Sequence, residues 1–281
     1  MTQDNKEIYR SHHDAIISKR WHSPHAIRRY NHHTQYQAFL ECVPVGCTVV
    51  DAGCGEGVLS VLLAKHGCRV IGVDISEPNI AEAKAFALRE GVADRCEFLV
   101  GDAERLPLPD KSADVVVSSH VLEHLPDFVQ GVRELNRVAK TLVVVAIPTC
   151  LNPASWVLLG GDKYWTVSRR TPYAIFVGFF RVVGAMLRGQ EGVNETYAGH
   201  PELIHIHRFP HRGRMLLELG GLQVVRYRAS SFPIPYLSFL VPVSRLLGAF
   251  RYWPLFRNFG FGTTYVCHPC HAAESYTSSN Q

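Results

Sequence analysis

The sequence contains no apolar run of the about twenty residues that a membrane-spanning helix needs, and its N-terminus has no apolar signal region. Charged residues are also few, at 19% of the 281 residues, against 47% hydrophobic residues. This balance excludes a disordered or fibrous chain, and no internal repeat is visible. We therefore expect a non-transmembrane protein with one large core and an appended subregion.

Cysteine usage and charge placement exclude further classes. The eight cysteines are scattered, several of them in predicted strands, which favours reduced thiols in a cytoplasmic protein. Cys267 and Cys270 form a single C-x-x-C without a distant partner pair, which is poor evidence for zinc. Basic residues are interleaved with bulky apolar residues and form no stripe, so we expect no nucleic-acid partner.

The chain is organised around residues 47–57, which read CTVVDAGCGEG. A β-branched apolar run ends in Asp51, and Gly53, Gly55 and Gly57 then alternate before an amphipathic segment. This pattern predicts a strand, a tight turn and a helix start, with glycines where a ligand approaches the backbone. A dinucleotide fingerprint would read G-x-G-x-x-G, and a carboxylate at Asp51 would repel a pyrophosphate but suits an ammonium group.

This D-x-G-x-G-x-G pattern, together with the H-x-L-E-H-L pattern that starts at His120, resembles the class I S-adenosylmethionine (SAM)-dependent methyltransferases. The resemblance implies SAM as the cofactor, with its methionine end on the glycine loop. Asp74 ends a second apolar strand about twenty residues after Gly53, where an acceptor for the ribose hydroxyls is expected.

In the resembled family an Asp-Ala pair after the third strand faces the adenine. The resemblance therefore implies that Asp102 accepts from the exocyclic amine while Ile75 and Ala103 pack on the ring. The full set of expected cofactor-binding residues is Asp51, Gly53, Gly55, Gly57, Asp74, Ile75, Asp102, Ala103 and Ser118.

The resemblance is strong over about residues 45–148 and weaker over 208–267. It implies a Rossmann-like α/β fold, in which a seven-stranded, mostly parallel sheet has helices on both faces and an inserted helical lid. The expected parts are an N-terminal helical cap (1–44), a SAM-binding core (45–148), the inserted lid (149–207), the rest of the core (208–271) with a second apolar insertion (232–258), and a disordered tail (272–281).

Local signals predict where several helices begin. Residues 1–22 read as a loose amphipathic helix, and Ser23 and Pro24 suit the N-cap and first position of a better one. Ser76 is a candidate N-cap for a helix over 78–90.

The catalytic candidates follow the fourth predicted strand. His120 is the first candidate for a general base, because an imidazole takes a phenol, hydroxyl or amine proton near neutral pH; the alternative is a histidine that only orients its surroundings. Glu123 and His124 complete the motif. In metal-free members of the resembled family the glutamate and histidine of this motif brace the loop, so no metal is expected. The alternative is a metal on His120, Glu123 and His124, which share a face if the turn is helical, with His205 or His207 as a fourth ligand.

The favoured function is methyl transfer from SAM to a small or lipid-like, acidic acceptor. The alternatives are a SAM-binding protein without turnover and a NAD-dependent oxidoreductase. Asp51, Asp74 and Asp102 count against both, because a NAD protein has no use for Asp102 there and a degenerate fold has no reason to keep all three.

Charge is divided unevenly along the chain. Residues 42–150 carry 10 Lys and Arg against 15 Asp and Glu, whereas residues 151–260 carry 13 against 5. The acidic half suits a sulfonium cofactor. The basic half suggests an anionic substrate or an anionic membrane surface, unless it is only a solvated face.

The two insertions contain apolar tracts rimmed by arginine. Such faces suit either a peripheral membrane contact or a pocket for an amphiphilic substrate, and the alternative is that the insertions pack on each other as a helical subdomain.

Overall fold

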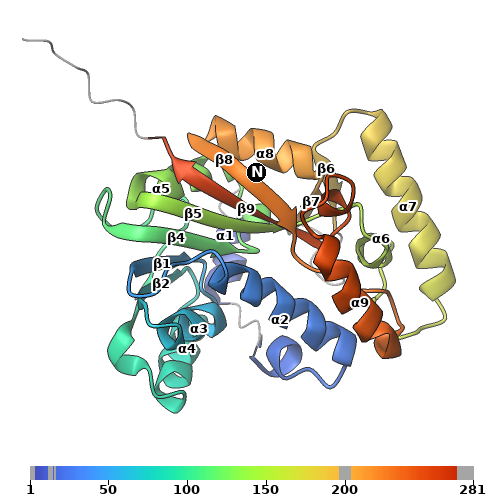
Figure 1. The fold of residues 1–281 in the computed structure, drawn as a ribbon. Coiled ribbons are helices and arrows are strands. Elements are labelled where there is room, and N and C mark those ends of the chain that lie inside the picture. The colour runs from blue at the N-terminus through green and yellow to red at the C-terminus, as the bar shows by residue number, and fades with distance from the viewer. Residues whose placement is uncertain (1–3, 12–14, 16, 196–203, 271–281) are drawn as a thin grey trace, which may run out of the picture.

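The computed structural model describes residues 4–11, 15, 17–195 and 204–270. Seven strands form one sheet in the order β3-β2-β1-β4-β5-β9-β8 (Figure 1). Their bounds are β1 Thr48–Ala52, β2 Arg69–Asp74, β3 Cys96–Val100, β4 Ala113–Ser119, β5 Ala139–Pro148, β8 Leu222–Ala229 and β9 Gly262–Pro269. Strands β1 to β5 pair in parallel, and β9 is antiparallel to both β5 and β8. The predicted seven-stranded, mostly parallel α/β sheet is confirmed.

Helices cover both faces of the sheet, because neighbouring residues of each central strand point to opposite sides. Val49 of β1 packs in a core with α3 (Val58–Lys65) and α4 (Glu77–Arg89). Val50 packs in a second core with α5 (Phe128–Val138) and α8 (Pro210–Leu219). Both valines are fully buried, which explains why the central strands read as continuous apolar runs.

The strand order reverses at β1, which lies between β2 and β4. In open α/β sheets ligands bind at the carboxyl ends of the strands beside such a reversal. The carboxyl ends of β1, β2 and β4 carry Asp51, Asp74 and Ser118. The fold therefore gathers the predicted cofactor residues at one edge of the sheet.

The segment before β1 contains α1 (Asp4–Ser11), a π-helical turn (Ile17–Trp21) and α2 (Ala26–Leu40). The predicted start of α2 was wrong, because His25 occupies the N-cap position. The Ser23 hydroxyl instead accepts from the His25 N–H (3.3 Å) in the preceding turn. The prediction for α4 is confirmed: its N-cap Ser76 accepts from the Asn79 N–H at 3.3 Å.

Two insertions lie at one end of the sheet (Figure 1). The first contains α6 (Pro153–Leu159), α7 (Thr171–Leu187) and a hairpin of β6 (Gly192–Asn194) and β7 (Ile206–Arg208). The second contains α9 (Val241–Leu247) and the 3₁₀ turns η4 (Ser238–Leu240), η5 (Gly248–Phe250) and η6 (Phe256–Asn258). Two further 3₁₀ turns are η2 (Ala93–Arg95) and η3 (Leu122–His124).

Both insertions share a core with α2. This core contains Ile27, Tyr30, Ala154, Val157, Tyr164 and Phe261, with Tyr236 and Val241 packed against it. The Tyr236 N–H also donates to the Tyr164 carbonyl at 2.7 Å. Within the described residues, no helix has the length and apolar character to cross a bilayer. The predicted tail, 272–281, lies outside the described residues.

Candidate active site

The glycine loop needs glycine both for its backbone angles and for space. Gly53, Gly55 and Gly57 have φ angles of +78°, +53° and +75°, in the left-handed region that other residues rarely adopt. A Cβ at Gly53 would lie 2.2 Å from the Val121 side chain. The N–H of Gly53 donates to the Val73 carbonyl at 2.7 Å, which holds the loop against β2.

Asp74, the residue predicted to bind the ribose, lies directly against this loop. Its Oδ2 accepts from the Gly55 N–H at 2.8 Å, and its Oδ1 accepts from the Ser76 N–H at 2.9 Å. The carboxylate therefore joins the end of β2, the glycine loop and the start of α4. Ile75, beside it, is half-buried.

Asp51 lies at the end of β1 and is buried, with a relative exposure of 1%. Its Oδ2 accepts from the Ser60 hydroxyl at 2.7 Å. Burial raises the pKa of Asp51 to about 7; the Ser60 hydrogen bond opposes this rise, and the negative charge of Asp74 adds to it. Ser118 donates from its hydroxyl to the Ala52 carbonyl at 3.1 Å and so ties β4 to the end of β1.

Asp102 and Ala103 follow β3, and Lys6, which is not among the residues predicted from the sequence, contacts Asp102. Lys6 of α1 contacts Asp102 Oδ2 at 2.5 Å and also pairs with Glu104 Oε2. Desolvation lowers the pKa of Lys6, but its hydrogen bonds to the two carboxylates outweigh this and raise it. Helix α1 thus lies over the site predicted for the adenine.

His120 follows β4 in a strained conformation, with φ at +58°. Its N–H donates to the Ala146 carbonyl at 2.9 Å, and its Nδ1 lies 3.1 Å from Glu123 Oε1. Its Nε2 is buried and has no hydrogen-bond partner among the described residues.

Glu123 has no exposed side-chain surface. Burial would raise the pKa of Glu123, but the hydrogen bond and charge of His120, with the charges of His124 and His205, lower it to about 2.

A second carboxylate, Glu195, follows β6 and binds histidines from β7 and the residue before it. Its Oε2 lies 3.2 Å from His205 Nδ1 and 2.9 Å from His207 Nε2. Burial would raise the pKa of Glu195, but these two histidines lower it. His205 Nε2 is also 3.9 Å from Glu123 Oε1, so the β6–β7 hairpin meets the predicted catalytic turn.

The metal alternative required a helical turn to place His120, Glu123 and His124 on one face, and this condition is not met, because η3 is a 3₁₀ turn and His120 is left-handed. Among the described residues, two groups bring three ligand atoms within 4.8 Å of one another: Glu123, His124 and His205, and Glu195, His205 and His207. Either group could hold a divalent ion. In the first group His205 stands where the metal alternative expected His120, and His207 belongs to the second group.

The N-terminal cap contributes cations to the same region. Desolvation lowers the pKa of His32 on α2 well below its ordinary value, and the charges of Arg20, Arg28 and His120 lower it further. Burial raises the pKa of Tyr164 to about 12, although the charges of Arg28 and Arg20 act to lower it. The Arg28 guanidinium also lies 3.9 Å from the Trp165 ring centroid. Arg20 and Arg28 therefore lie near His32 of α2 and near Tyr164 of the first insertion.

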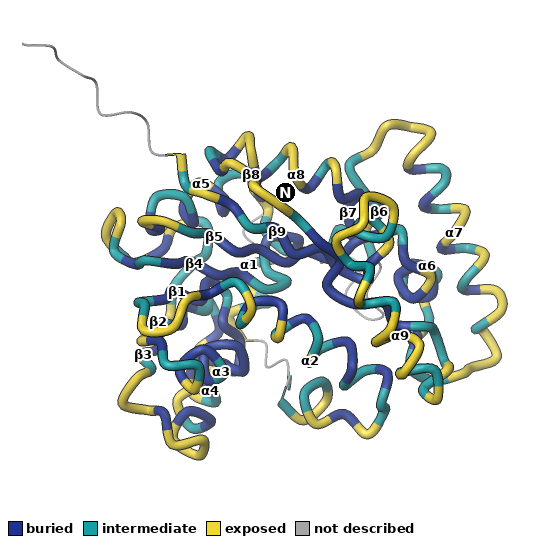
Figure 2. Tube along the Cα trace, in the orientation of Figure 1, coloured by how far each residue is buried: buried dark blue, intermediate teal, exposed yellow. Residues whose placement is uncertain are grey.

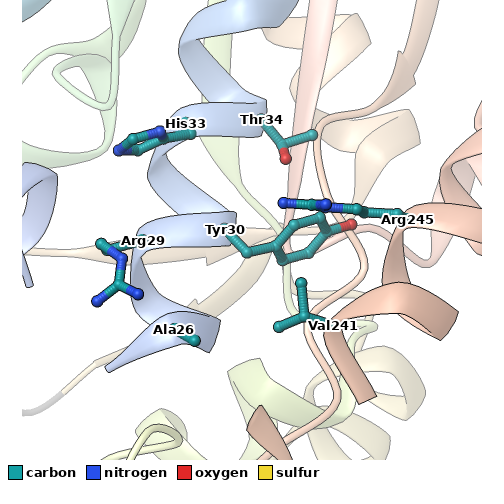
Figure 3. Close-up of a pocket in the computed structure, with 7 residues that line it drawn as sticks. All are labelled: Ala26, Arg29, Tyr30, His33, Thr34, Val241 and Arg245. Atoms are coloured by element: carbon teal, nitrogen blue, oxygen red, sulfur yellow. The ribbon is translucent and has the colours of Figure 1, made fainter. Parts of the chain in front are cut away.

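A separate small pocket opens between α2 and α9 (Figure 3). It is lined by Ala26, Arg29, Tyr30, His33, Thr34, Val241 and Arg245. Tyr30, Thr34, Val241 and Arg245 lie together, whereas Arg29 and His33 lie on its other side (Figure 3). Because it contains none of the predicted cofactor or catalytic residues, we assign it no part in the chemistry.

The comparisons with known proteins agree with this geometry. A family profile described as "Methyltransferase domain" matches residues 50–147. A probable chloroplastic tocopherol O-methyltransferase from rice is 43% identical over 93 residues, which cover 33% of this chain and 26% of the rice protein. The ubiquinone biosynthesis O-methyltransferase of Pseudomonas paraeruginosa is 31% identical over 140 residues, covering 50% of this chain and 51% of that protein.

A solved SAM-dependent methyltransferase from Methanosarcina mazei superposes with a TM-score of 0.56 at 19% identity, covering 83% of this chain and 97% of that one. This likeness shows the shared fold. The chain spans about half or less of the length of the two curated relatives. The comparisons favour neither a NAD-dependent oxidoreductase nor a binding protein without turnover. The matched profile identifies residues 50–147 as a methyltransferase domain, and the strand order of the sheet agrees with a class I SAM-dependent methyltransferase fold, with SAM as the cofactor.

Proposed function

We propose that the protein methylates a lipid-like, acidic acceptor and that His120 takes the proton the acceptor loses. The single observation that carries the role of His120 is its contact with Glu123 at 3.1 Å, which leaves the buried Nε2 without a partner among the described residues. A carboxylate on Nδ1 fixes the ring and its tautomer, so that Nε2 presents its lone pair. Glu123 suits this role because its low pKa keeps it ionised at neutral pH.

The cofactor is proposed to lie across the carboxyl ends of β1 to β4, on Asp51, Gly53, Gly55, Gly57, Asp74, Ile75, Asp102, Ala103 and Ser118. SAM supplies an electrophilic methyl on a sulfonium, which is already an excellent leaving group. The protein then has to hold the acceptor in line with the methyl, exclude water and accept one proton at His120 Nε2. With SAM bound, methyl transfer would break the methyl–sulfur bond as the bond to the acceptor forms, and His120 Nε2 would hold the proton of the acceptor.

Two observations support an acidic, amphiphilic acceptor. Arg20 and Arg28 both lie close enough to His32 and Tyr164 to affect their pKa values, and guanidinium groups pair well with carboxylate or phosphate. Two relatives are named for tocopherol and for ubiquinone biosynthesis, and both of these compounds join a polar ring to a long apolar tail. The insertions at 149–207 and 232–258 are proposed to form the lid over such an acceptor.

We also propose that the reaction takes place in the cytoplasm. All eight cysteines are free thiols, as a reducing compartment requires. Cys47 and Cys68 remain unbonded with their Sγ atoms 3.8 Å apart.

Metal-assisted catalysis is the second candidate, favoured by the grouping of Glu123, His124 and His205. A divalent ion there would polarise the acceptor and lower the proton affinity of the acceptor. His120 would then not be needed as a base. Dialysis against a chelator separates the two mechanisms. Activity that survives dialysis supports His120 as the base, whereas activity that is lost and returns with a divalent ion supports the metal.

The decisive experiment is incubation of the protein with methyl-labelled SAM and fractionated cell extract, followed by mass spectrometry. We expect the methyl label in one acidic compound of the lipid fraction. Over the same incubation time, the His120→Ala variant should label no compound. Label confined to water-soluble compounds would contradict the lipid-like acceptor. Absence of any labelled product, with SAM bound, would contradict methyl transfer itself.

A further inference from the structure

Helix α7 presents its large side chains to the outside and buries its small ones. Its buried residues are Ala174, Gly178, Val182 and Ala185. Its exposed residues include Tyr173, Phe176, Phe180 and Leu187, with relative exposures of 71%, 64%, 65% and 79%. A surface helix of a globular protein normally does the reverse and buries its bulky apolar residues.

The orientation of α7 is fixed by close packing against α6. A Cβ at Gly178 would lie 1.8 Å from the Trp156 carbonyl oxygen, and a Cβ at Gly160 would lie 1.9 Å from the Ala174 carbonyl oxygen. The two backbones are therefore in direct contact, and no bulkier face of α7 fits there. The aromatic face is consequently held outward, along the outer edge of the molecule (Figure 2).

Arg181 anchors the helix from its inner side. Its guanidinium donates to the Leu159 carbonyl and, at 2.8 Å, to the Asn194 carbonyl. Asn194 ends β6 and directly precedes Glu195, which binds His205 and His207. The exposed face of α7 is thus connected to the histidine cluster of the candidate active site through one arginine and a short strand.

The charge on α7 and on the residues that immediately flank it is positive. Residues 163–190 contain five Lys and Arg and no Asp or Glu. Arg169 and Arg170 before α7, and Arg188 after it, are exposed. The face also has a hollow lined by Tyr173, Phe176, Val177, Phe180, Arg181 and Arg188. An apolar face bordered by arginines at both ends is complementary to a surface with an apolar interior and anionic head groups.

We propose that α7 docks the protein on an anionic lipid bilayer, with Phe176 and Phe180 buried among the head groups. The helix lies on the membrane and does not cross it, because no described helix has the length and apolar character to do so. A second copy of the chain fits the face less well. A two-fold interface would bring the same arginines of the two copies together, and no acidic residue on α7 is available to compensate them.

Co-sedimentation with vesicles tests this inference without SAM or acceptor, so its failure would leave the proposed methyl transfer untouched. Vesicles of phosphatidylcholine alone are compared with vesicles that also contain phosphatidylglycerol. We expect binding only to the anionic vesicles, weakened about tenfold or more by Phe176→Ser with Phe180→Ser. Replacing Arg169 and Arg170 by Gln should weaken binding several-fold and reduce its dependence on salt.

Matched controls lie on α4, on η2 after it and at the end of α8. Leu88→Ser with Leu219→Ser removes two leucines of similar exposure, 72% and 67%, and Lys84→Gln with Arg95→Gln removes two exposed charges. These variants should bind vesicles like the wild type. Equal loss in the controls, or no binding to either vesicle, would overturn the proposal. The proposal would also be overturned if the protein were a dimer in sedimentation equilibrium and the dimer were lost in the phenylalanine variant but kept in the leucine variant.

Discussion

The Nδ1 atom of His120 lies 3.1 Å from Oε1 of Glu123, a carboxylate with no exposed surface. Three residues separate the two in sequence, yet the contact depends on the left-handed backbone of His120 and the 3₁₀ turn that follows it. Such strain persists only where the surrounding structure enforces it, and it is concentrated at functional sites. Here β4 and β5 enforce it through the bond from the His120 N–H to the Ala146 carbonyl.

We expect His120→Ala to lower kcat about 10²-fold or more, because it removes the proton acceptor, while the affinity for SAM stays within a few-fold. Steady-state kinetics and calorimetry measure the two quantities separately. Glu123→Gln should lower kcat in the same direction, since an amide cannot stabilise a protonated His120. The control is His22→Ala, which changes an exposed histidine of the cap. Full activity in the His120 variant would remove it from the mechanism.

Asp74→Ala should weaken SAM binding by roughly 1–3 kcal/mol, because the ribose hydroxyls lose their proposed acceptor. The same change also removes the acceptors of the Gly55 and Ser76 N–H groups, so the glycine loop loosens. Calorimetry with SAM measures the effect, and Asp94→Ala, on an exposed turn, is the matched control. Unchanged SAM affinity in the Asp74 variant, or NADH binding by the wild type, would contradict the cofactor site.

The buried Asp51 predicts a stability that falls as the pH rises. Its pKa is raised from 3.8 to about 7, so between these values the folded state keeps a proton that the unfolded state has released. The contribution of Asp51 to the free energy of unfolding is fully present below the pKa of the unfolded state. This contribution is lost as the pH rises through the pKa of the folded state, at up to about 1.4 kcal/mol per pH unit.

Urea unfolding of the unliganded protein at several pH values between 4 and 8 checks this linkage. Asp51→Asn should remove most of the Asp51 contribution to the slope of the free energy of unfolding against pH, because an amide does not titrate. The variant should therefore gain stability relative to the wild type as the pH rises. Asp94→Asn serves as the control at an exposed site. Parallel pH profiles for the wild type and the Asp51 variant would show that Asp51 does not titrate in this range.

Lys6→Gln should weaken SAM binding several-fold, because α1 loses the ion pairs that hold it over Asp102 and Glu104. The pairs are partly exposed, so added salt should weaken binding by the wild type more than by the variant. Arg10→Gln is the matched control: it removes one charge from the same helix, whose ion-pair partner among the described residues is Glu7 of that helix. An unchanged SAM dissociation rate in the Lys6 variant would exclude α1 as a cover for the cofactor.

The sequence predicts the parts of the site that a single strand–turn–helix unit builds. The three glycines, Asp74 and the Ser76 cap are all set by local backbone requirements, and the structure places them together. Parallel strands then align their carboxyl ends, which adds Asp102 and Ser118 without further information. This is why the residues proposed to bind the cofactor can be predicted from the sequence.

The acceptor side depends on contacts that no local pattern encodes. His205 meets Glu123 across more than eighty residues, and Lys6 meets Asp102 across ninety-six. The hairpin that carries Glu195 and His207 has strands of three residues each, too short for an alternating pattern to stand out. For α7, nearly every position is apolar, so periodicity alone could not reveal which face is buried. Its glycines and alanines decide this, because only they permit the contact with α6.

That contact leads to the last prediction. Gly178→Ala should destabilise the protein, because the added methyl group would lie 1.8 Å from the Trp156 carbonyl oxygen and α7 would have to move away from α6. Overpacking of this kind costs about 1–3 kcal/mol, or more where backbone has to shift, and lowers Tm by about 2–4 °C per kcal/mol in a chain of this size.

Gly184→Ala on the same helix is the matched control. A Cβ there meets only the Arg188 side chain, at 3.1 Å, which can rotate away. Since alanine favours a helix over glycine by up to about 1 kcal/mol, this variant should be neutral or more stable. Thermal unfolding of the two variants, one destabilised and one not, distinguishes close packing from helix propensity. Equal changes in Tm would mean that the contact between α6 and α7 does not fix the orientation of the aromatic face.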